Sequence, residues 1–168
     1  MNAGEAEAFT VIYQRYRDWV VFLARRITGS EDLALDVMQE TFLYFLGKFP
    51  GFTLTCQLKT FLYPVVRNHS LNAIGKTRRL QSGVEEIRHL EHLPSSAVPP
   101  GACDDLEALL SSLSEDHRET LMLRFIDGLS LGEIAEATGV PLGTAKSRLH
   151  HAISKLREDP RSREFFIK

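Results

Sequence analysis

The chain has 168 residues, 43% of them hydrophobic and 25% charged, an ordinary composition for one or two small soluble domains. Its formal net charge of −2 argues against indiscriminate binding to nucleic acid, and no apolar run reaches the roughly 20 residues needed to span a bilayer. The first residues, MNAGEAEAF, lack the basic start and apolar core of a signal peptide, so we expect a cytoplasmic protein without membrane insertion.

Apolar residues repeat at helical spacing through the first half of the chain and predict three helices in a domain over 1–80. The predicted helices span 5–28, 31–47 and 58–79. Gly29 and Ser30 are residue types that end one helix and begin the next. Pro64 lies inside the third span, where it removes a backbone hydrogen bond, so we expect a kink or a later start of this helix.

The segment 81–103 is interpreted as a flexible linker, because it is rich in Pro, Gly and Ser and has little apolar periodicity. It contains His89 and His92, which could form half of a metal site. No third ligand lies near them in the sequence, so solvated linker histidines are the preferred interpretation. Cys56 and Cys103 match no metal spacing and are interpreted as thiols outside any disulfide. We therefore expect no metal and no cofactor.

Four short helices are predicted after the linker, in a domain over 104–160 that is followed by a tail over 161–168. Each helix has a start or stop signal in the sequence. The signals are Asp104 or Asp105, Ser114, Gly128, a capping box of Ser130 and Glu133, Gly139, and Pro141. No strand pattern occurs along the chain. The predicted fold class is therefore all-α, with two small helical domains joined by the linker.

The last two predicted helices, separated by a sharp turn at Gly139, have the pattern of a helix-turn-helix. The apolar stripe of the final helix is Ala145, Leu149, Ala152, Ile153 and Leu156. Its opposite side carries Lys146, Ser147, His150, His151 and Ser154. A cation beside small hydrogen-bonding groups suits base edges and phosphates, so we interpret this side as a DNA-binding face. The alternative is a small helical bundle with a solvated basic face.

Acidic residues are missing from two segments that carry basic ones. None occurs over 41–84, where about six are expected from the chain average, and none over 141–157. The basic residues in these segments are Lys48, Lys59, Arg67, Lys76, Arg78 and Arg79, and then Lys146, Arg148, Lys155 and Arg157. The two positive segments predict two contact surfaces for a polyanion.

Three stretches of the sequence resemble the bacterial sigma factors, in particular their extracytoplasmic-function (ECF) group. They are LALDVMQETFLYFLGKF, LKTFLYPVVRNHSLNAI and LSEDHRETLMLRFIDGLSLGEIAEATGVPLGTAKSRLHHAISKLRE. The resemblance implies an alternative sigma factor that binds core RNA polymerase, directs promoter-specific transcription initiation and is held inactive by an anti-sigma factor. It also implies that the first domain binds the polymerase and melts the promoter, and that the second reads the upstream promoter element.

Carried over by matching motifs, the resemblance assigns residues to each role. For the upstream element they are Lys146, Ser147, His150 and His151, with Arg148 as a phosphate contact. For the downstream element and its melting they are Phe61, Arg67, Asn68, Asn72, Lys76, Arg78 and Arg79. For the polymerase they are Asp36, Gln39, Glu40 and Leu43. Many family members carry Arg where this chain has His151, which implies weaker phosphate binding or altered sequence choice here.

Several roles remain open at this point. Asp36 and Glu40 are alternatively solvated helix residues, and Phe61 is alternatively a core residue rather than a base-stacking one. The competing function is a stand-alone helix-turn-helix regulator whose first domain senses a signal or dimerises. The sequence has no Gly-rich phosphate loop and no hydrolase or metalloprotease motif, so an enzyme is not expected.

Overall fold

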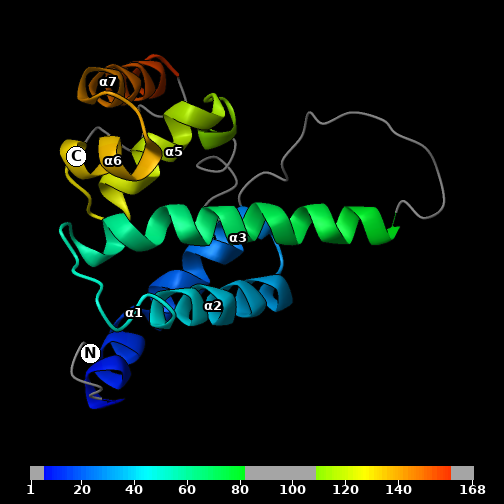
Figure 1. The fold of residues 1–168 in the computed structure, drawn as a ribbon. Coiled ribbons are helices and arrows are strands. Elements are labelled where there is room, and N and C mark those ends of the chain that lie inside the picture. The colour runs from blue at the N-terminus through cyan, green and yellow to red at the C-terminus, as the bar shows by residue number, and fades with distance from the viewer. Residues whose placement is uncertain (1–5, 82–108, 160–168) are drawn as a thin grey trace. The chain divides into compact units, whose positions relative to one another are not determined.

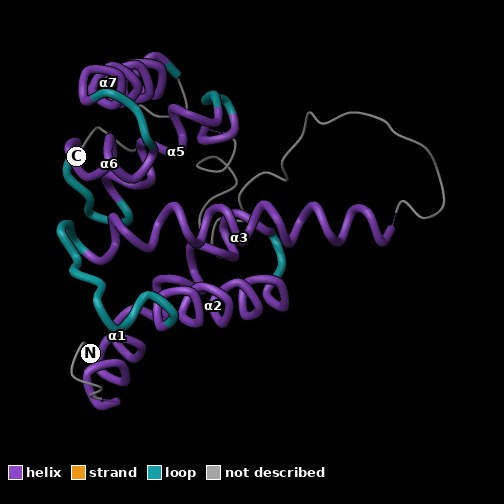
Figure 2. The backbone as a smooth tube through the Cα atoms, in the orientation of Figure 1, coloured by secondary structure: helices purple, strands orange, loops and turns teal. Residues whose placement is uncertain are grey.

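The computed structural model describes residues 6–81 and 109–159, and the chain divides into two compact units, Met1–Ala97 and Val98–Lys168. Every regular element in the described residues is a helix (Figures 1 and 2). The predicted all-α fold with two helical domains is therefore confirmed. The linker histidines and Cys103 lie outside the described residues.

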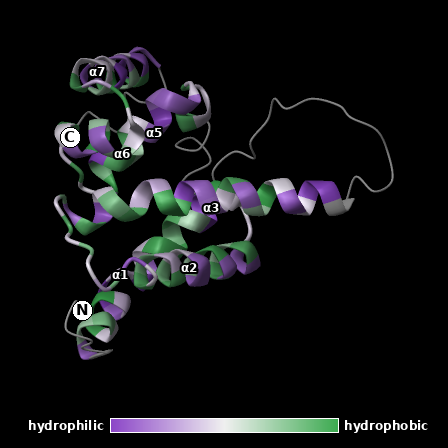
Figure 3. Cartoon of the chain, viewed as in Figure 1, coloured by the Kyte–Doolittle hydropathy of each residue, from purple (hydrophilic) through white to green (hydrophobic). Residues whose placement is uncertain are grey.

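The first unit contains three mutually packed helices, α1 (Ala6–Thr28), α2 (Glu31–Leu46) and α3 (Leu58–Gln81). Hydrophobic and hydrophilic residues alternate along each helix, as amphipathic packing requires (Figure 3). The buried side chains include Val20, Leu23, Ala34, Val37, Phe42, Phe45, Leu62, Tyr63 and Val66. Between α1 and α2, Gly29 adopts a φ of 68°, and the Ser30 side chain accepts a hydrogen bond from the backbone N–H of Leu33. The chain therefore reverses direction where the sequence predicts.

Helix α3 begins at Leu58 and continues through Pro64, so the expectation of a later start is wrong. The backbone N–H of Phe61 donates to the carbonyl of Gln57 at 3.1 Å, which closes the first turn before the proline is reached. Leu62 and Tyr63, directly before Pro64, are almost fully buried against the other helices. This packing offsets a proline penalty of about 3 kcal/mol in a helix interior.

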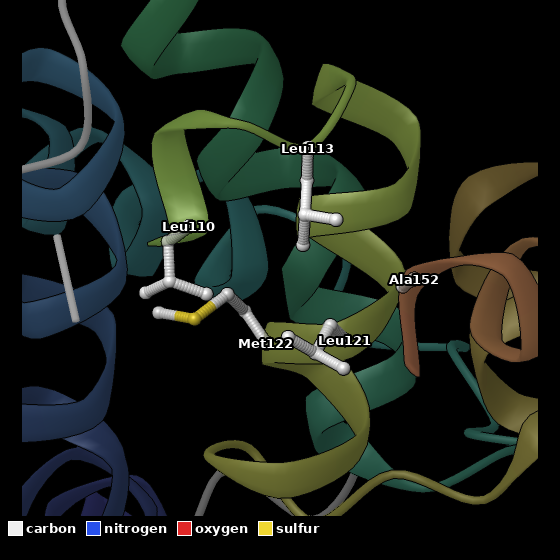
Figure 4. Packing of buried hydrophobic residues seen from close by; sticks show 5 residues of the cluster. All are labelled: Leu110, Leu113, Leu121, Met122 and Ala152. Atoms are coloured by element: carbon white, nitrogen blue, oxygen red, sulfur yellow. The ribbon is translucent and has the colours of Figure 1, made fainter. Parts of the chain in front are cut away.

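The second unit contains α5 (Glu115–Phe125), α6 (Leu131–Thr138) and α7 (Leu142–Glu158), preceded by a helical turn at 109–111. A compact apolar cluster joins α5 to α7 (Figure 4). Its buried members are Leu110, Leu113, Leu121, Met122 and Ala152, and Leu149, Ile153 and Leu156 pack against it. The stripe predicted for the final helix is thus the side that faces this core. Ala145 and Ala152 are the residues of the stripe that are fully buried.

Helices α6 and α7 form the predicted helix-turn-helix. Both hydrogen bonds of the Ser130–Glu133 capping box are present at the start of α6. The helix ends at Gly139, whose φ of 70° lies in the left-handed region that glycine adopts at little cost. Pro141 is the N-cap of α7 and accepts from the backbone N–H of Thr144 at 2.9 Å. These local signals set the turn between the two helices.

Replacing Glu133 with alanine should weaken the start of α6 by about 1 kcal/mol, which corresponds to roughly five-fold faster amide hydrogen exchange there. The backbone N–H of Ser130 donates to the Glu133 carboxylate at 2.8 Å and lowers the pKa of that carboxyl. The stabilisation is therefore present above the ordinary carboxyl range and is lost as pH falls through the lowered pKa. The difference between wild type and variant should shrink in acid, whereas Glu136→Ala, outside the box, should change exchange little.

Candidate nucleic-acid and protein interfaces

The exposed side of α7 carries four of the five residues assigned to upstream DNA. Lys146, Ser147, His150 and His151 are all exposed, while Ala145 and Ala152 turn the other side of the helix into the core. The hydroxyl of Ser147 donates to the carbonyl of Thr144 at 3.0 Å, which leaves its lone pairs available as acceptors. The structure thus brings these four side chains onto one surface suited to a major groove. We call it the α7 face.

Arg148 is placed differently from its neighbours. Its guanidinium donates to the carboxylate of Asp116 on α5, and its side chain is only 21% exposed. Lys155 is also engaged within the unit, because its ammonium donates to the backbone carbonyl of Ser112. Two of the four basic residues over 141–157 therefore connect α7 to the rest of the unit. The positive charge offered to a ligand by the α7 face comes mainly from Lys146.

His117 is a member of this surface that the sequence reasoning missed. Its ring on α5 stacks on that of His151, with 5.9 Å between centroids and 25° between planes. The ring of His150 meets that of His151 edge-on at 5.7 Å. We call these three residues the imidazole cluster. No spacing in the linear sequence connects His117 to the other two, because only the packing of α5 on α7 brings them together.

Helix α3 presents a polar and basic side that matches the downstream assignment. Asn68, Asn72 and Lys76 are exposed and follow one another at intervals of one turn, and Arg78 and Arg79 are exposed near the end of the helix. Arg67 is partly buried. Val66, Ser70 and Ile74 face the core from the opposite side of α3. Amide groups beside cations can satisfy unpaired bases and backbone phosphates. We call this surface the α3 face.

Phe61 lies in a cluster of phenylalanines at the start of α3. Its ring centroid is 5.1 Å from that of Phe52 and 6.0 Å from that of Phe45, and Phe49 contacts both Phe45 and Phe52. Phe61 is only partly buried, so one part of the ring packs while another remains accessible. The cluster holds the loop over 47–57 against α2 and α3. The role of Phe61 includes packing, whether or not a base stacks on it.

Helix α2 exposes all four residues assigned to the polymerase, namely Asp36, Gln39, Glu40 and Leu43. Leu43 is 69% exposed, and Leu35 and Leu46 are also exposed leucines on this helix. Leu35, Gln39, Leu43 and Leu46 share one side of the helix at intervals of three or four residues. An exposed stripe of leucines bordered by acids is typical of a protein-binding surface. Leu43 was predicted from the sequence as a contact, whereas Leu35 and Leu46 were not.

Glu40 also makes a contact within the unit. Its carboxylate lies 2.9 Å from Nδ1 of His69 on α3, and the His69 ring meets Tyr44 edge-on at 6.2 Å. The ammonium of Lys48 sits 4.4 Å from the centroid of the Tyr44 ring. The alternative interpretation of Glu40 was a solvated helix residue without a contact. Its carboxylate instead connects α2 to α3 through His69.

Three further observations concern metal ligands, the thiol of Cys56 and membrane-spanning helices in the described residues. They contain no group of three or more His, Cys, Asp or Glu side chains placed to hold a metal ion. Cys56, in the loop before α3, is partly buried and forms no disulfide with another described residue. Over 6–81 and 109–159, no helix is long and apolar enough to cross a membrane.

Comparison with known proteins covers both units. The family described as "Sigma-70 region 2" matches residues 12–80, and "Sigma-70, region 4" matches residues 109–158. The ECF RNA polymerase sigma factor SigW of Bacillus subtilis (strain 168) is 26% identical over 174 residues, covering 96% of this chain and 93% of that protein. The ECF RNA polymerase sigma-E factor of Escherichia coli (strain K12) is 30% identical over 165 residues, covering 90% and 86%.

Two solved structures have a similar fold. One is the sigma factor RpoE in complex with the anti-sigma factor NepR from Bartonella quintana, with a TM-score of 0.66 and 26% identity, covering 91% of this chain and 96% of that chain. The other is CnrH in complex with the cytosolic domain of CnrY, with a TM-score of 0.65 and 20% identity, covering 92% and 88%. The second likeness concerns the fold alone.

Proposed function

This chain belongs to the ECF group of bacterial sigma factors, and we propose that it binds core RNA polymerase and directs transcription initiation from specific promoters. The observation that carries the proposal is similarity to a sigma-E factor over 90% of the chain, with the two sigma regions in their expected order. A sigma factor needs a polymerase-binding surface and DNA-reading surfaces in one chain. Sigma factors are not enzymes, so the chemistry of RNA synthesis belongs to the polymerase.

The proposed division of labour follows the two units. Residues 1–80 would bind the polymerase and melt the downstream element, and residues 104–160 would read the upstream element. The linker over 81–103 would join them, and the tail over 161–168 has no assigned role. The exposed α7 face supports contact with duplex DNA, where a cation and hydroxyl and imidazole groups can meet phosphates and base edges.

The polymerase-binding surface is proposed on α2. The exposed leucines supply apolar area that a partner can bury, and Asp36 and Gln39 supply the polar rim that interfaces of this kind have. Glu40, held by His69, would fix the orientation of α2 relative to α3. Polymerase docking would in this way be coupled to the placement of the α3 face.

An anti-sigma factor is proposed as a second protein partner. The support is the likeness, at 26% identity, to a sigma factor crystallised with its anti-sigma factor NepR. A protein that covered the exposed leucines of α2 would block polymerase access without touching the DNA-reading residues. Because core polymerase acts in the bacterial cytoplasm, we place the function of this chain there.

Transcription with purified components tests the proposal. The chain is mixed with core polymerase and fragmented genomic DNA, and the bound promoters and transcript starts are sequenced. Binding to core polymerase with initiation from a shared pair of promoter elements is the expected result. A chain that neither binds core polymerase nor starts transcription would overturn the proposal. Tight binding to a palindromic duplex without polymerase would favour the stand-alone regulator instead.

Replacing both Asn68 and Asn72 with alanine should reduce promoter melting by about ten-fold or more, because the unstacked bases lose amide hydrogen-bond partners at a cost of roughly 1–3 kcal/mol. Both side chains are exposed, so the fold should be unchanged. The fluorescence of 2-aminopurine placed in the downstream element measures melting by the holoenzyme. Gln14→Ala, an exposed amide on α1, is the matched control and should melt normally. Normal melting by the double variant would remove these residues from the proposed site.

A further inference from the structure

We propose that the imidazole cluster is a proton-dependent phosphate-binding surface, so that upstream promoter affinity rises as pH falls. This inference rests on the proposed function and adds His117 of α5 to the DNA-binding residues. Imidazole is the side chain that gains positive charge between about pH 8 and pH 5. A cluster of three beside Lys146 can therefore change the charge of the α7 face over this range.

The geometry places the cluster where DNA phosphates would pass. His150 and His151 are exposed on the same side of α7 as Lys146, one turn further along the helix. The ring of His117 lies against that of His151, which extends the surface from α7 onto α5. A helix inserted in the major groove is flanked by the two phosphate backbones. His117, on the helix α5 that packs against α7, would add a second point of backbone contact.

The two helices that pack against α7 carry acidic and basic side chains. The charged side chains of α5, which packs against α7, are Glu115, Asp116, Arg118, Glu119 and Arg124. Asp116 is paired with Arg148, and Arg124 donates to the carbonyl of Leu129 at 2.9 Å. On α6, Glu133 is held in the capping box and Glu136 is exposed. Carboxyl and guanidinium groups as a class ionise outside the range between about pH 6 and pH 8, where imidazole as a class changes charge.

Protonation has opposite consequences with and without DNA. In the protein alone, positive charge on both stacked rings of His117 and His151 is unfavourable, because like charges at 5.9 Å repel. A phosphate backbone over the surface offsets this repulsion and adds charge-assisted hydrogen bonds. DNA binding is therefore expected to take up protons, and by linkage the affinity falls as pH rises.

The test uses the holoenzyme formed from the full chain and core polymerase, with a duplex carrying an upstream element that this holoenzyme selects. Affinity is measured by fluorescence anisotropy at fixed ionic strength at about pH 6 and about pH 8, where imidazole changes charge. Wild type should bind about ten-fold more tightly at the lower pH, and the slope of log affinity against log salt should steepen by about one to two. His117→Gln with His151→Gln should flatten both responses.

Two further variants make the result specific. His151→Arg carries a permanent charge and should bind tightly at both pH values. His89→Gln with His92→Gln removes the same number of imidazoles from the linker and should keep the wild-type response. A response in His117→Gln with His151→Gln equal to that of wild type would overturn the inference. If instead the holoenzyme selects no promoter at any pH, the proposed function itself fails, which is a different result.

Discussion

Replacing Leu43 with alanine should weaken binding of the chain to core polymerase by about 30-fold, the effect of losing one interface residue worth about 2 kcal/mol. Leu43 is 69% exposed on α2 and contributes little to the core of the first unit. The free energy of unfolding should therefore change by less than about 0.5 kcal/mol. Titration of labelled protein with core polymerase measures the affinity, and urea unfolding measures the stability.

A matched control shows whether the loss of binding is specific to the α2 stripe or follows from removing any exposed apolar side chain. Val11 on α1 is 63% exposed and is not part of the α2 stripe, so Val11→Ala should bind core polymerase normally. Asp36→Ala with Gln39→Ala should also weaken binding to the polymerase, while upstream duplex contact changes little. Unchanged polymerase affinity in both the Leu43 variant and this double variant would show that another surface makes the contact.

Replacing Lys146 and His151 with alanine should lower promoter affinity by about 10- to 100-fold, because a lost base or phosphate contact costs roughly 1–3 kcal/mol. Binding of the variant to core polymerase should be unchanged, because the residues proposed to bind the polymerase lie in the other unit. Gel-shift measurements with the holoenzyme and a promoter fragment give the first quantity, and titration with core polymerase gives the second.

Arg157→Ala provides the control on the same helix. Arg157 is exposed on α7, three turns beyond Lys146, and is not part of the α7 face. Its removal should reduce promoter affinity by less than about three-fold, the size expected for a distant screened charge. A loss of polymerase binding in the Lys146 and His151 variant would mean that the α7 face had been assigned to the wrong partner.

A tertiary contact bears on the phosphate-binding role that was predicted for Arg148. In the sequence Arg148 is one more cation among residues that are predicted to contact DNA. In the structure its guanidinium is engaged by Asp116, so a phosphate would have to compete with a carboxylate already in place. The simplest role that follows is to hold α7 against α5. The phosphate-binding role and this structural role differ because of Asp116. Nothing in the sequence indicated that Asp116 contacts Arg148.

Local structure could be predicted from the sequence because its causes are local. Hydrophobic periodicity placed α1, α2 and α3 within two residues at each end, and the capping box and Gly139 placed the turn between α6 and α7. The later start of α3 that Pro64 suggested was the exception. The penalty of this proline is local, whereas the packing of Leu62 and Tyr63 that offsets it depends on helices far away in the chain.

The sequence by itself determined the helices, the all-α fold and which side of α7 would be polar, because each follows from residues three or four positions apart. Only the tertiary structure decided which polar side chains of different helices contact one another. The packing of one helix on another brings His117 into contact with His151, His69 with Glu40 and Asp116 with Arg148. Such contacts depend on how buried side chains fit between helices, and no periodicity within a single helix encodes that fit.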